Sequence, residues 1–201
     1  GRGFLGTSHG SAGVLHELVE VAPLFENATA KGLVAATLDH IVSQQFLGGN
    51  FPTEFYNATQ DVLVQWDHGA PGVSATLFRA ATVLGDSRYA TSAAKAQDAV
   101  WARGLLTKGS QLCHGLSGNV MTTLIAYQET GNSTYLYRAF RFVDFMMTHP
   151  TLVEPSLMRV VTPDPWVLWE GSFESAILMW SDLLNTSDPA ELSMTGYQPA
   201  L

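Results

Sequence analysis

The feature that most constrains the fold of this chain is an internal repeat with a spacing of 46 residues. Five pairs of identical residues keep this spacing: His68 and His114, Gly85 and Gly131, Ser87 and Ser133, Tyr89 and Tyr135, and Asp98 and Asp144. The Gly-Asp-Ser and Gly-Asn-Ser triplets inside the two copies are typical of a turn that ends one helix and caps the next. The repeat therefore predicts a chain built from helix hairpins.

Apolar residues recur at helical spacing on both sides of these turns. In the first copy they are Val73, Leu77, Ala80, Ala81 and Leu84, then Tyr89, Ala93, Ala96 and Val100. In the second they are Val120, Met121, Leu124 and Ile125, then Tyr135, Ala139, Phe142, Val143 and Met146. Upstream, a helix carrying Leu15, Leu18 and Val19 and another carrying Leu33, Ala36, Thr37, His40 and Ile41 are expected. Few stretches alternate with a period of two, so we predict an all-α fold.

A polar cluster followed by Gly-x-x-Gly precedes the first helix of each pair. The copies are Ser8-His9-Gly10-Ser11-Ala12-Gly13, Asp67-His68-Gly69-Ala70-Pro71-Gly72 and Cys113-His114-Gly115-Leu116-Ser117-Gly118, with a weakened copy at Trp169-Glu170-Gly171-Ser172-Phe173. Helix pairs can stack as an open solenoid or close as a ring. Because a ring would bring all the clusters to one axis, their chemistry favours the ring over the solenoid.

Composition excludes several classes of function. The net charge of −8 disfavours nucleic acids and anionic membrane surfaces as partners. No apolar run approaches the roughly 18–20 residues that an integral membrane segment needs. The 201 residues are predicted to form a single domain, 1–201.

Cysteine usage bears on the location of the protein. The single cysteine, Cys113, excludes an internal disulfide, so the fold does not depend on an oxidising compartment and a cytoplasmic location is predicted. Membrane association and secretion stay open as alternatives. Secretion would explain four Asn-x-Ser/Thr triplets, which begin at Asn27, Asn57, Asn132 and Asn185. Asn132 is better explained as a helix cap.

The clusters offer metal ligands. Cys113 and His114 supply sulfur and nitrogen, and Asp67, one repeat earlier than Cys113, supplies a third, oxygen ligand. Three protein ligands with one open position are typical of a catalytic zinc site. The alternative is that Cys113 is a small buried residue and His114 a hydrogen-bonded turn residue.

Two further histidines head helices. His9 can act as a general acid or base, or it can cap its turn. His68 is expected to serve the turn or its neighbours, because adjacent residues such as Asp67 and His68 rarely both reach one ion. Glu170 is expected either to line the cavity as a polar wall or to pair with Lys108 or Arg2. A glycosidase on an α/α toroid would need paired carboxylates, and among the clusters only Asp67 and Glu170 qualify.

The clusters resemble those of a known family. Thr7-Ser8-His9-Gly10, Trp66-Asp67-His68-Gly69-Ala70-Pro71-Gly72, Lys108-Gly109-Ser110-Gln111-Leu112-Cys113-His114-Gly115, Tyr135-Leu136-Tyr137-Arg138-Ala139 and Leu168-Trp169-Glu170-Gly171 are similar, in this order, to motifs of the lanthionine synthetase C-like (LanC-like) proteins, eukaryotic type. The resemblance implies an α/α toroid, of which this chain would supply the C-terminal part: an incomplete ring of about four of seven helix pairs. An N-terminal part is then expected to be missing.

The resemblance also implies a chemistry. One zinc ion would be held by Asp67, Cys113 and His114, and a thiol, with glutathione expected, would bind it and add to dehydroalanine or dehydrobutyrine in a peptide. His9 matches the family histidine that protonates the enolate, and Lys108 matches a lysine associated with glutathione binding and catalysis.

One departure from the family pattern qualifies this expectation. The family has its first zinc cysteine where this chain has Asp67. A carboxylate donates less charge than a thiolate, so zinc affinity and the reactivity of the bound sulfur should fall. Two functions therefore stay open: a weakened zinc-dependent thiol-addition enzyme, and a non-catalytic glutathione-binding or scaffold protein that has lost the metal.

Overall fold

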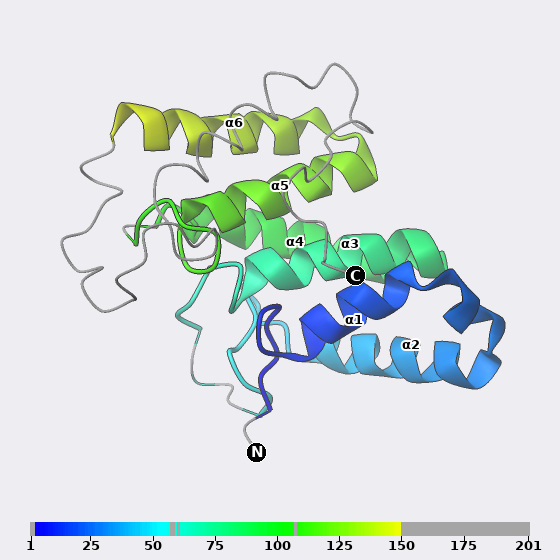
Figure 1. The fold of residues 1–201 in the computed structure, drawn as a ribbon. Helices are drawn as coiled ribbons and strands as arrows, with labels where there is room; N and C mark the ends of the chain where they lie inside the picture. The colour runs from blue at the N-terminus through cyan, green and yellow to red at the C-terminus, as the bar shows by residue number, and fades with distance from the viewer. Residues whose placement is uncertain (1–2, 57–58, 60, 107, 150–201) are drawn as a thin grey trace. The chain divides into compact units, whose positions relative to one another are not determined.

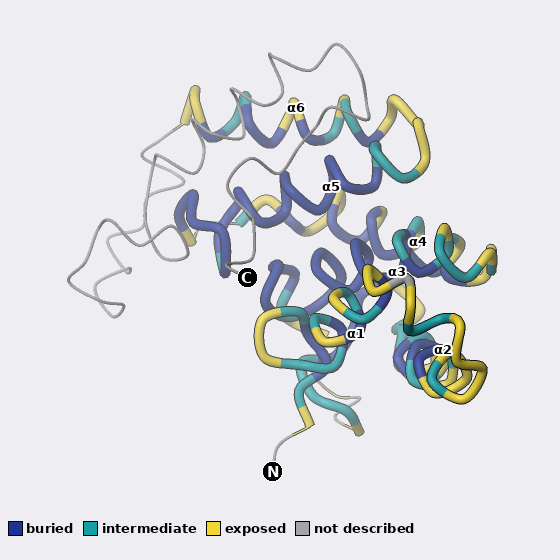
Figure 2. Tube along the Cα trace, turned by 45° about the vertical axis from the view of Figure 1, so that its right-hand side comes forward, coloured by how far each residue is buried: buried dark blue, intermediate teal, exposed yellow. Residues whose placement is uncertain are grey.

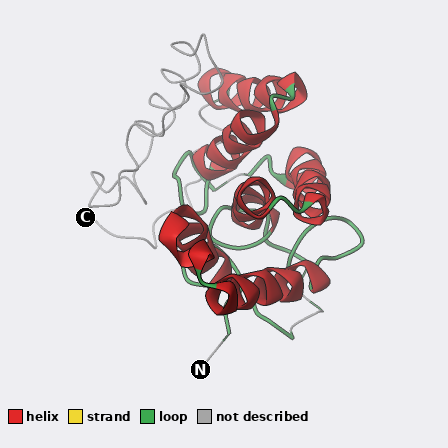
Figure 3. Cartoon of the chain, turned by 90° about the vertical axis from the view of Figure 1, so that its right-hand side faces the viewer, coloured by secondary structure: helices red, strands yellow, loops and turns green. Residues whose placement is uncertain are grey.

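The computed structural model describes residues 3–56, 59, 61–106 and 108–149. Its helices are α1 (Ser11–Glu20), the short 3-10 helix η1 (Ala22–Glu26), α2 (Ala28–Ser43), α3 (Ala70–Leu84), α4 (Ser87–Arg103), α5 (Leu116–Thr130) and α6 (Ser133–Thr148). In the described part of the chain the helices are joined by loops, and an isolated bridge between Phe4 and Glu54 is the only β pairing (Figure 3). The all-α prediction is confirmed.

Two compact units divide the chain, Gly1–Leu105 and Leu106–Leu201, and each is described by itself. The first unit contains α1 to α4, and the second contains α5 and α6 (Figure 1). The predicted fourth cluster around Glu170 lies outside the described residues.

Helix α3 is the centre of the first unit. Its residues Ala70–Phe78 and Ala80 are buried, which makes it enclosed on most sides rather than on one stripe (Figure 2). It packs against both α1 and α4. The hydroxyl of Thr76 donates to the carbonyl of Ala12 on α1 at 3.1 Å. On the other side, the buried amide of Gln97 on α4 donates to the hydroxyl of Ser74 at 2.8 Å.

The turn between α3 and α4 follows the design that the sequence predicted. Gly85 ends α3 in the left-handed conformation, with φ of 69°, and its amide bonds the carbonyl of Ala81 at 2.9 Å. The side chain of Asp86 then accepts a hydrogen bond from the amide of Arg88 at 3.0 Å and caps α4. Gly85 and Asp86 thus satisfy backbone groups at the helix ends that would otherwise be unpaired. The turn of this hairpin is therefore determined by residues within the turn itself.

The second unit repeats this hairpin. Gly131 ends α5 with φ of 67°, and Asn132 caps α6 by accepting from the amide of Thr134 at 3.0 Å. This confirms Asn132 as a cap. The buried residues of α6 are those of the predicted stripe: Tyr135, Ala139, Phe142, Val143 and Met146.

Helix α2 is confirmed, but its buried residues share only Ile41 with the predicted stripe. The buried residues are Val34, Leu38 and Ile41, whereas Leu33 is 66% exposed. Both sets keep helical spacing, so periodicity alone does not choose between them. The choice is made by packing within the first unit, where α2 packs against α1 and Tyr89 of α4 donates its hydroxyl to Asp39 of α2 at 3.0 Å.

Candidate metal and acid–base site

His9 is positioned by the turn that precedes α1. The amide of Ser11 bonds the carbonyl of Phe4 at 3.1 Å and closes this turn. The amide of Leu5 bonds the carbonyl of Thr53 at 3.0 Å and ties the turn to the loop after α2. His9 therefore stands at the entrance of α1 on a backbone that is held at both ends.

A second turn, before α3, lies directly against the first. It is closed by the amide of Gln65, which bonds the carbonyl of His68 at 3.1 Å. The amide of Thr7 bonds the carbonyl of Asp67 at 3.0 Å and joins the two turns. A Cβ on Gly6 would lie 1.9 Å from that carbonyl oxygen, so only glycine permits this approach.

Asn50 holds the start of α3 in place. Its side-chain oxygen accepts from the amide of Ala70 at 2.7 Å, and its nitrogen donates to Asp61 at 2.8 Å and to the carbonyl of Leu63 at 3.0 Å. Burial by itself raises the pKa of Asp61, but hydrogen bonds from Arg103 and Asn50 and the Arg103 charge outweigh it, so the pKa is lowered. No sequence motif singled out Asn50, because its partners lie 11 to 20 residues further along the chain.

Together the two turns assemble a cluster of three side chains. Nδ1 of His9 lies 3.0 Å from Oδ1 of Asp67, and Nε2 of His68 lies 3.2 Å from Oδ2 of the same carboxylate. The side chain of Asp67 is 2% exposed, that of His68 15% and that of His9 62%. A buried carboxylate is thus flanked by two imidazoles, one of which faces solvent.

This cluster departs from one expectation. We expected adjacent Asp67 and His68 not to reach one ion together, yet each offers a ligand atom within 4.8 Å of the other and of His9. A backbone turn is closed by the bond from Gln65 to His68, and within it Nε2 of His68 lies 3.2 Å from Oδ2 of Asp67. Adjacency in the sequence was the only signal of this contact.

Cys113 and His114 occupy the corresponding turn of the second unit. Cys113 is buried, and its Sγ lies 3.5 Å from Nε2 of His114. The turn is closed by the amide of Leu116, which bonds the carbonyl of Gly109 at 3.0 Å. Gly109 has a positive φ of 92°, a conformation that glycine adopts without strain.

The repeat places Asp67 and Cys113 at equivalent positions. Asp67 stands three residues before the first residue of α3, Ala70, and Cys113 three before the first residue of α5, Leu116. Each therefore presents its side chain at the start of a long buried helix. Asp67 belongs to the first unit and Cys113 and His114 to the second, so a shared ion on all three stays a prediction.

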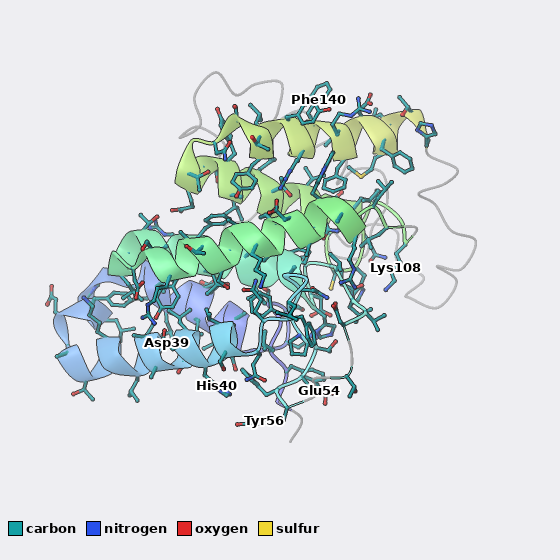
Figure 4. The ribbon with its side chains drawn as sticks, turned by 180° about the vertical axis from the view of Figure 1, so that it is seen from behind. Asp39, His40, Glu54, Tyr56, Lys108 and Phe140 are labelled. Atoms are coloured by element: carbon teal, nitrogen blue, oxygen red, sulfur yellow. The ribbon has the colours of Figure 1, made fainter. Side chains whose placement is uncertain are left out.

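Lys108 is also in the second unit, on the loop before α5. Its side chain is exposed, as Figure 4 shows, and its carbonyl accepts from the amide group of Gln111 at 3.2 Å. Its role in thiol binding stays a prediction.

Comparison with known proteins identifies the relatives of this chain. The family model for lanthionine synthetase C-like proteins matches residues 1–152. The chain is 33% identical over 182 residues to "Glutathione S-transferase LANCL1" of Danio rerio, covering 90% of this chain and 43% of that protein. It is 31% identical over 200 residues to "LanC-like protein GCL1" of Arabidopsis thaliana, covering 98% of this chain and 44% of that one.

A solved structure supports the fold. Nisin cyclase superposes with a TM-score of 0.63 at 15% identity, over 93% of this chain and 52% of the cyclase. The predicted α/α-toroid fold is confirmed, and the chain corresponds to about half of that structure. Among the described helices, none has the length and apolar character to cross a membrane.

The chain spans less than half the length of either curated relative. The match to the family model nevertheless covers most of its residues, including the turns that carry His9, Asp67, Cys113 and His114. The chain belongs to the lanthionine synthetase C-like family.

Proposed function

We propose that this protein adds a thiol, glutathione or another, to dehydroalanine or dehydrobutyrine residues of a peptide in a zinc-dependent reaction. The observation that carries the proposal is the pair Cys113–His114 at the start of α5, with sulfur and imidazole nitrogen 3.5 Å apart. The printed name of the Danio rerio relative, a glutathione S-transferase, supports a thiol as the substrate.

The residues present suit one zinc ion. Cys113 supplies a buried sulfur, His114 an imidazole, and Asp67 a buried carboxylate. When bound, zinc would act as a Lewis acid that favours the thiolate form of a coordinated thiol. The proposal that all three residues hold it rests on the family motifs.

His9 is proposed to deliver the proton. Asp67 accepts a hydrogen bond from Nδ1 of the protonated ring at 3.0 Å, which fixes the ring and leaves Nε2 as the atom that exchanges a proton with the substrate. In the reaction the thiol S–H bond is broken, a C–S bond forms at the β-carbon and a proton is added at the α-carbon. No oxidant or further co-reactant is required.

Lys108 is proposed to assist thiol binding. Its exposed ammonium group lies on the loop that also carries Cys113, and glutathione carries carboxylates that an ammonium attracts. The proposed partners are therefore the thiol and the dehydroamino-acid peptide. A cytoplasmic location and a single domain over 1–201 complete the proposal.

A second candidate is a glutathione-binding or scaffold protein without metal. It is favoured by the carboxylate of Asp67, which already contacts two imidazoles, on His9 and His68. Those contacts satisfy the buried charge without an ion when either ring is protonated.

Cobalt substitution combined with a product assay separates the two candidates. The wild-type chain is expected to show a sulfur-to-cobalt charge-transfer band and to form a thioether from glutathione and a dehydroalanine peptide, detected by mass spectrometry. Cys113→Ser should lose the band and at least tenfold of the rate, and Asp67→Cys should bind the metal more tightly. His149→Ala, at an exposed position in the second unit, is the matched control.

The metal-free candidate makes the opposite prediction. If wild type shows neither band nor thioether while Asp67→Cys gains the band, the enzyme proposal is wrong. Glutathione binding to wild type, measured by calorimetry, would then support the scaffold function.

A further inference from the structure

The strongest unassigned feature is the cluster formed by His9, Asp67 and His68 within the first unit. We propose that these three side chains form a metal site without sulfur, which takes a divalent cation of the zinc or cobalt type. The site uses neither Cys113 nor His114, and it shares Asp67 and His9 with the proposed function.

The distances fit coordination. Ligand atoms around a tetrahedral zinc with bonds of about 2.0–2.1 Å are separated by about 3.3 Å. The nitrogen–oxygen distances in the cluster are 3.0 Å, from His9 to Oδ1 of Asp67, and 3.2 Å, from His68 to Oδ2 of Asp67, and one ligand atom from each of the three residues lies within 4.8 Å of the others. An ion can therefore replace the hydrogen bonds with small side-chain movements.

The charge of the cluster favours a cation. The carboxylate of Asp67 is almost fully withdrawn from water, which is costly for a charged group unless opposite charge compensates it. The two imidazoles compensate it only when protonated, whereas a divalent cation does so with both rings neutral. The ion would also stabilise the contact between the two turns.

The ligands are held before any ion binds. The two turns are joined by the backbone bond from Thr7 to Asp67 at 3.0 Å. The ring of Phe4 lies 5.7 Å from that of His68 and 6.4 Å from that of His9, between centroids, and limits their movement. Rigid support of this kind lowers the cost of ordering the ligands on binding.

The ligand types select the metal. Two imidazoles and one carboxylate suit zinc, cobalt, nickel or iron(II), whereas magnesium and calcium prefer sites made of oxygen alone. His9 is 62% exposed, so a cation has access from solvent and open coordination positions are available to water. Magnesium is therefore expected not to compete.

The test uses the full chain with Cys113→Ser and His114→Ala, which removes both candidate ligands of the second unit. Titration with Co²⁺ should give one bound equivalent with visible d–d absorption and no sulfur charge-transfer band. Zn²⁺ should displace the cobalt, and a large excess of Mg²⁺ should not.

Further substitutions in this background identify the ligands. His9→Ala and His68→Gln are each expected to weaken binding at least tenfold, and His149→Ala should leave it unchanged. Because the side chain of His9 is mostly exposed, His9→Ala keeps the core and decides the question even if His68→Gln unfolds the protein. Circular dichroism checks the fold of each variant.

Two results would overturn the proposal. One is the absence of cobalt binding by the Cys113→Ser/His114→Ala protein at millimolar Co²⁺. The other is binding that neither His9→Ala nor His68→Gln weakens. Both leave the enzyme proposal intact, because its sulfur band and its product are measured on the wild-type chain.

Discussion

At the residue scale, Asp67 is the position that most distinguishes this protein. It stands at the repeat position that Cys113 occupies in the second unit, and it contacts two histidines, His9 and His68. A cysteine lacks the second acceptor atom that holds the second ring. The substitution therefore couples a candidate zinc ligand to a candidate proton donor through a single carboxylate.

The close approach of the two turns depends on Gly6. Gly6→Ala should lower the free energy of unfolding by roughly 1–3 kcal/mol, because its Cβ would lie 1.9 Å from the Asp67 carbonyl oxygen. Chemical denaturation measures this loss. Gly32→Ala, in α2, is the matched control, since no heavy atom lies within 4 Å of its Cβ and it should stabilise by about 0.5–1 kcal/mol. Equal effects of the two variants would contradict the packing argument.

At the element scale, α2 and α4 are joined by a buried phenol. Tyr89 on α4 is 1% exposed and donates its hydroxyl to Asp39 on α2. Burial, together with the hydrogen bond and negative charge of Asp39, raises the pKa of Tyr89 to about 12. A raised pKa means that the folded state favours the protonated phenol. The stability that Tyr89 contributes is therefore fully present below about 10, the pKa of tyrosine in the unfolded chain.

The consequence is a defined loss of stability in alkali. Tyr89→Phe should cost about 1 kcal/mol at pH 7, from the lost hydrogen bond. As the pH rises from about 10 to about 12, the wild type should lose stability relative to Tyr89→Phe, because the phenol ionises in the unfolded state while it stays protonated in the folded state. Urea unfolding across this range measures the difference. Tyr56 is 85% exposed, so the wild type should not lose stability relative to Tyr56→Phe over the same pH range. An equal loss relative to Tyr56→Phe would contradict the assignment to Tyr89.

At the scale of the whole molecule, the proposed zinc ligands are distributed over two compact units. Asp67 belongs to Gly1–Leu105, and Cys113 and His114 to Leu106–Leu201. An ion held by all three would link the stabilities of both units, since binding to the native state alone adds about 4 kcal/mol at a thousandfold excess over Kd.

Hydrogen exchange tests this linkage. Zinc is expected to slow amide exchange in both α3 and α5 of the wild type. In Cys113→Ser/His114→Ala, zinc should slow exchange only around the turns that precede α1 and α3, where the His9 cluster lies. Protection of a single unit in the wild type would show that the ion is not shared.

The local structure of this protein could be predicted from its sequence. The 46-residue repeat gave the hairpins of α3–α4 and α5–α6, and Gly85, Gly131 and Asn132 end or cap helices as predicted. These features depend on residues within one or two turns of each other, whose conformational preferences act wherever the chain lies. The buried face of α2 depends on packing against other helices, and the spacing of its apolar residues did not predict which face is buried.

The tertiary structure alone decided which side chains meet. His9 and Asp67 are 58 positions apart and Asn50 and Ala70 are 20 apart, yet both pairs are in hydrogen-bond contact. The sequence predicted, from the ring, that the clusters of His9 and Asp67 face one axis, but the repeat contains no information on which atoms of the two loops come into contact. That approach is set by the backbone bond from Thr7 to Asp67 and by the space that Gly6 leaves open.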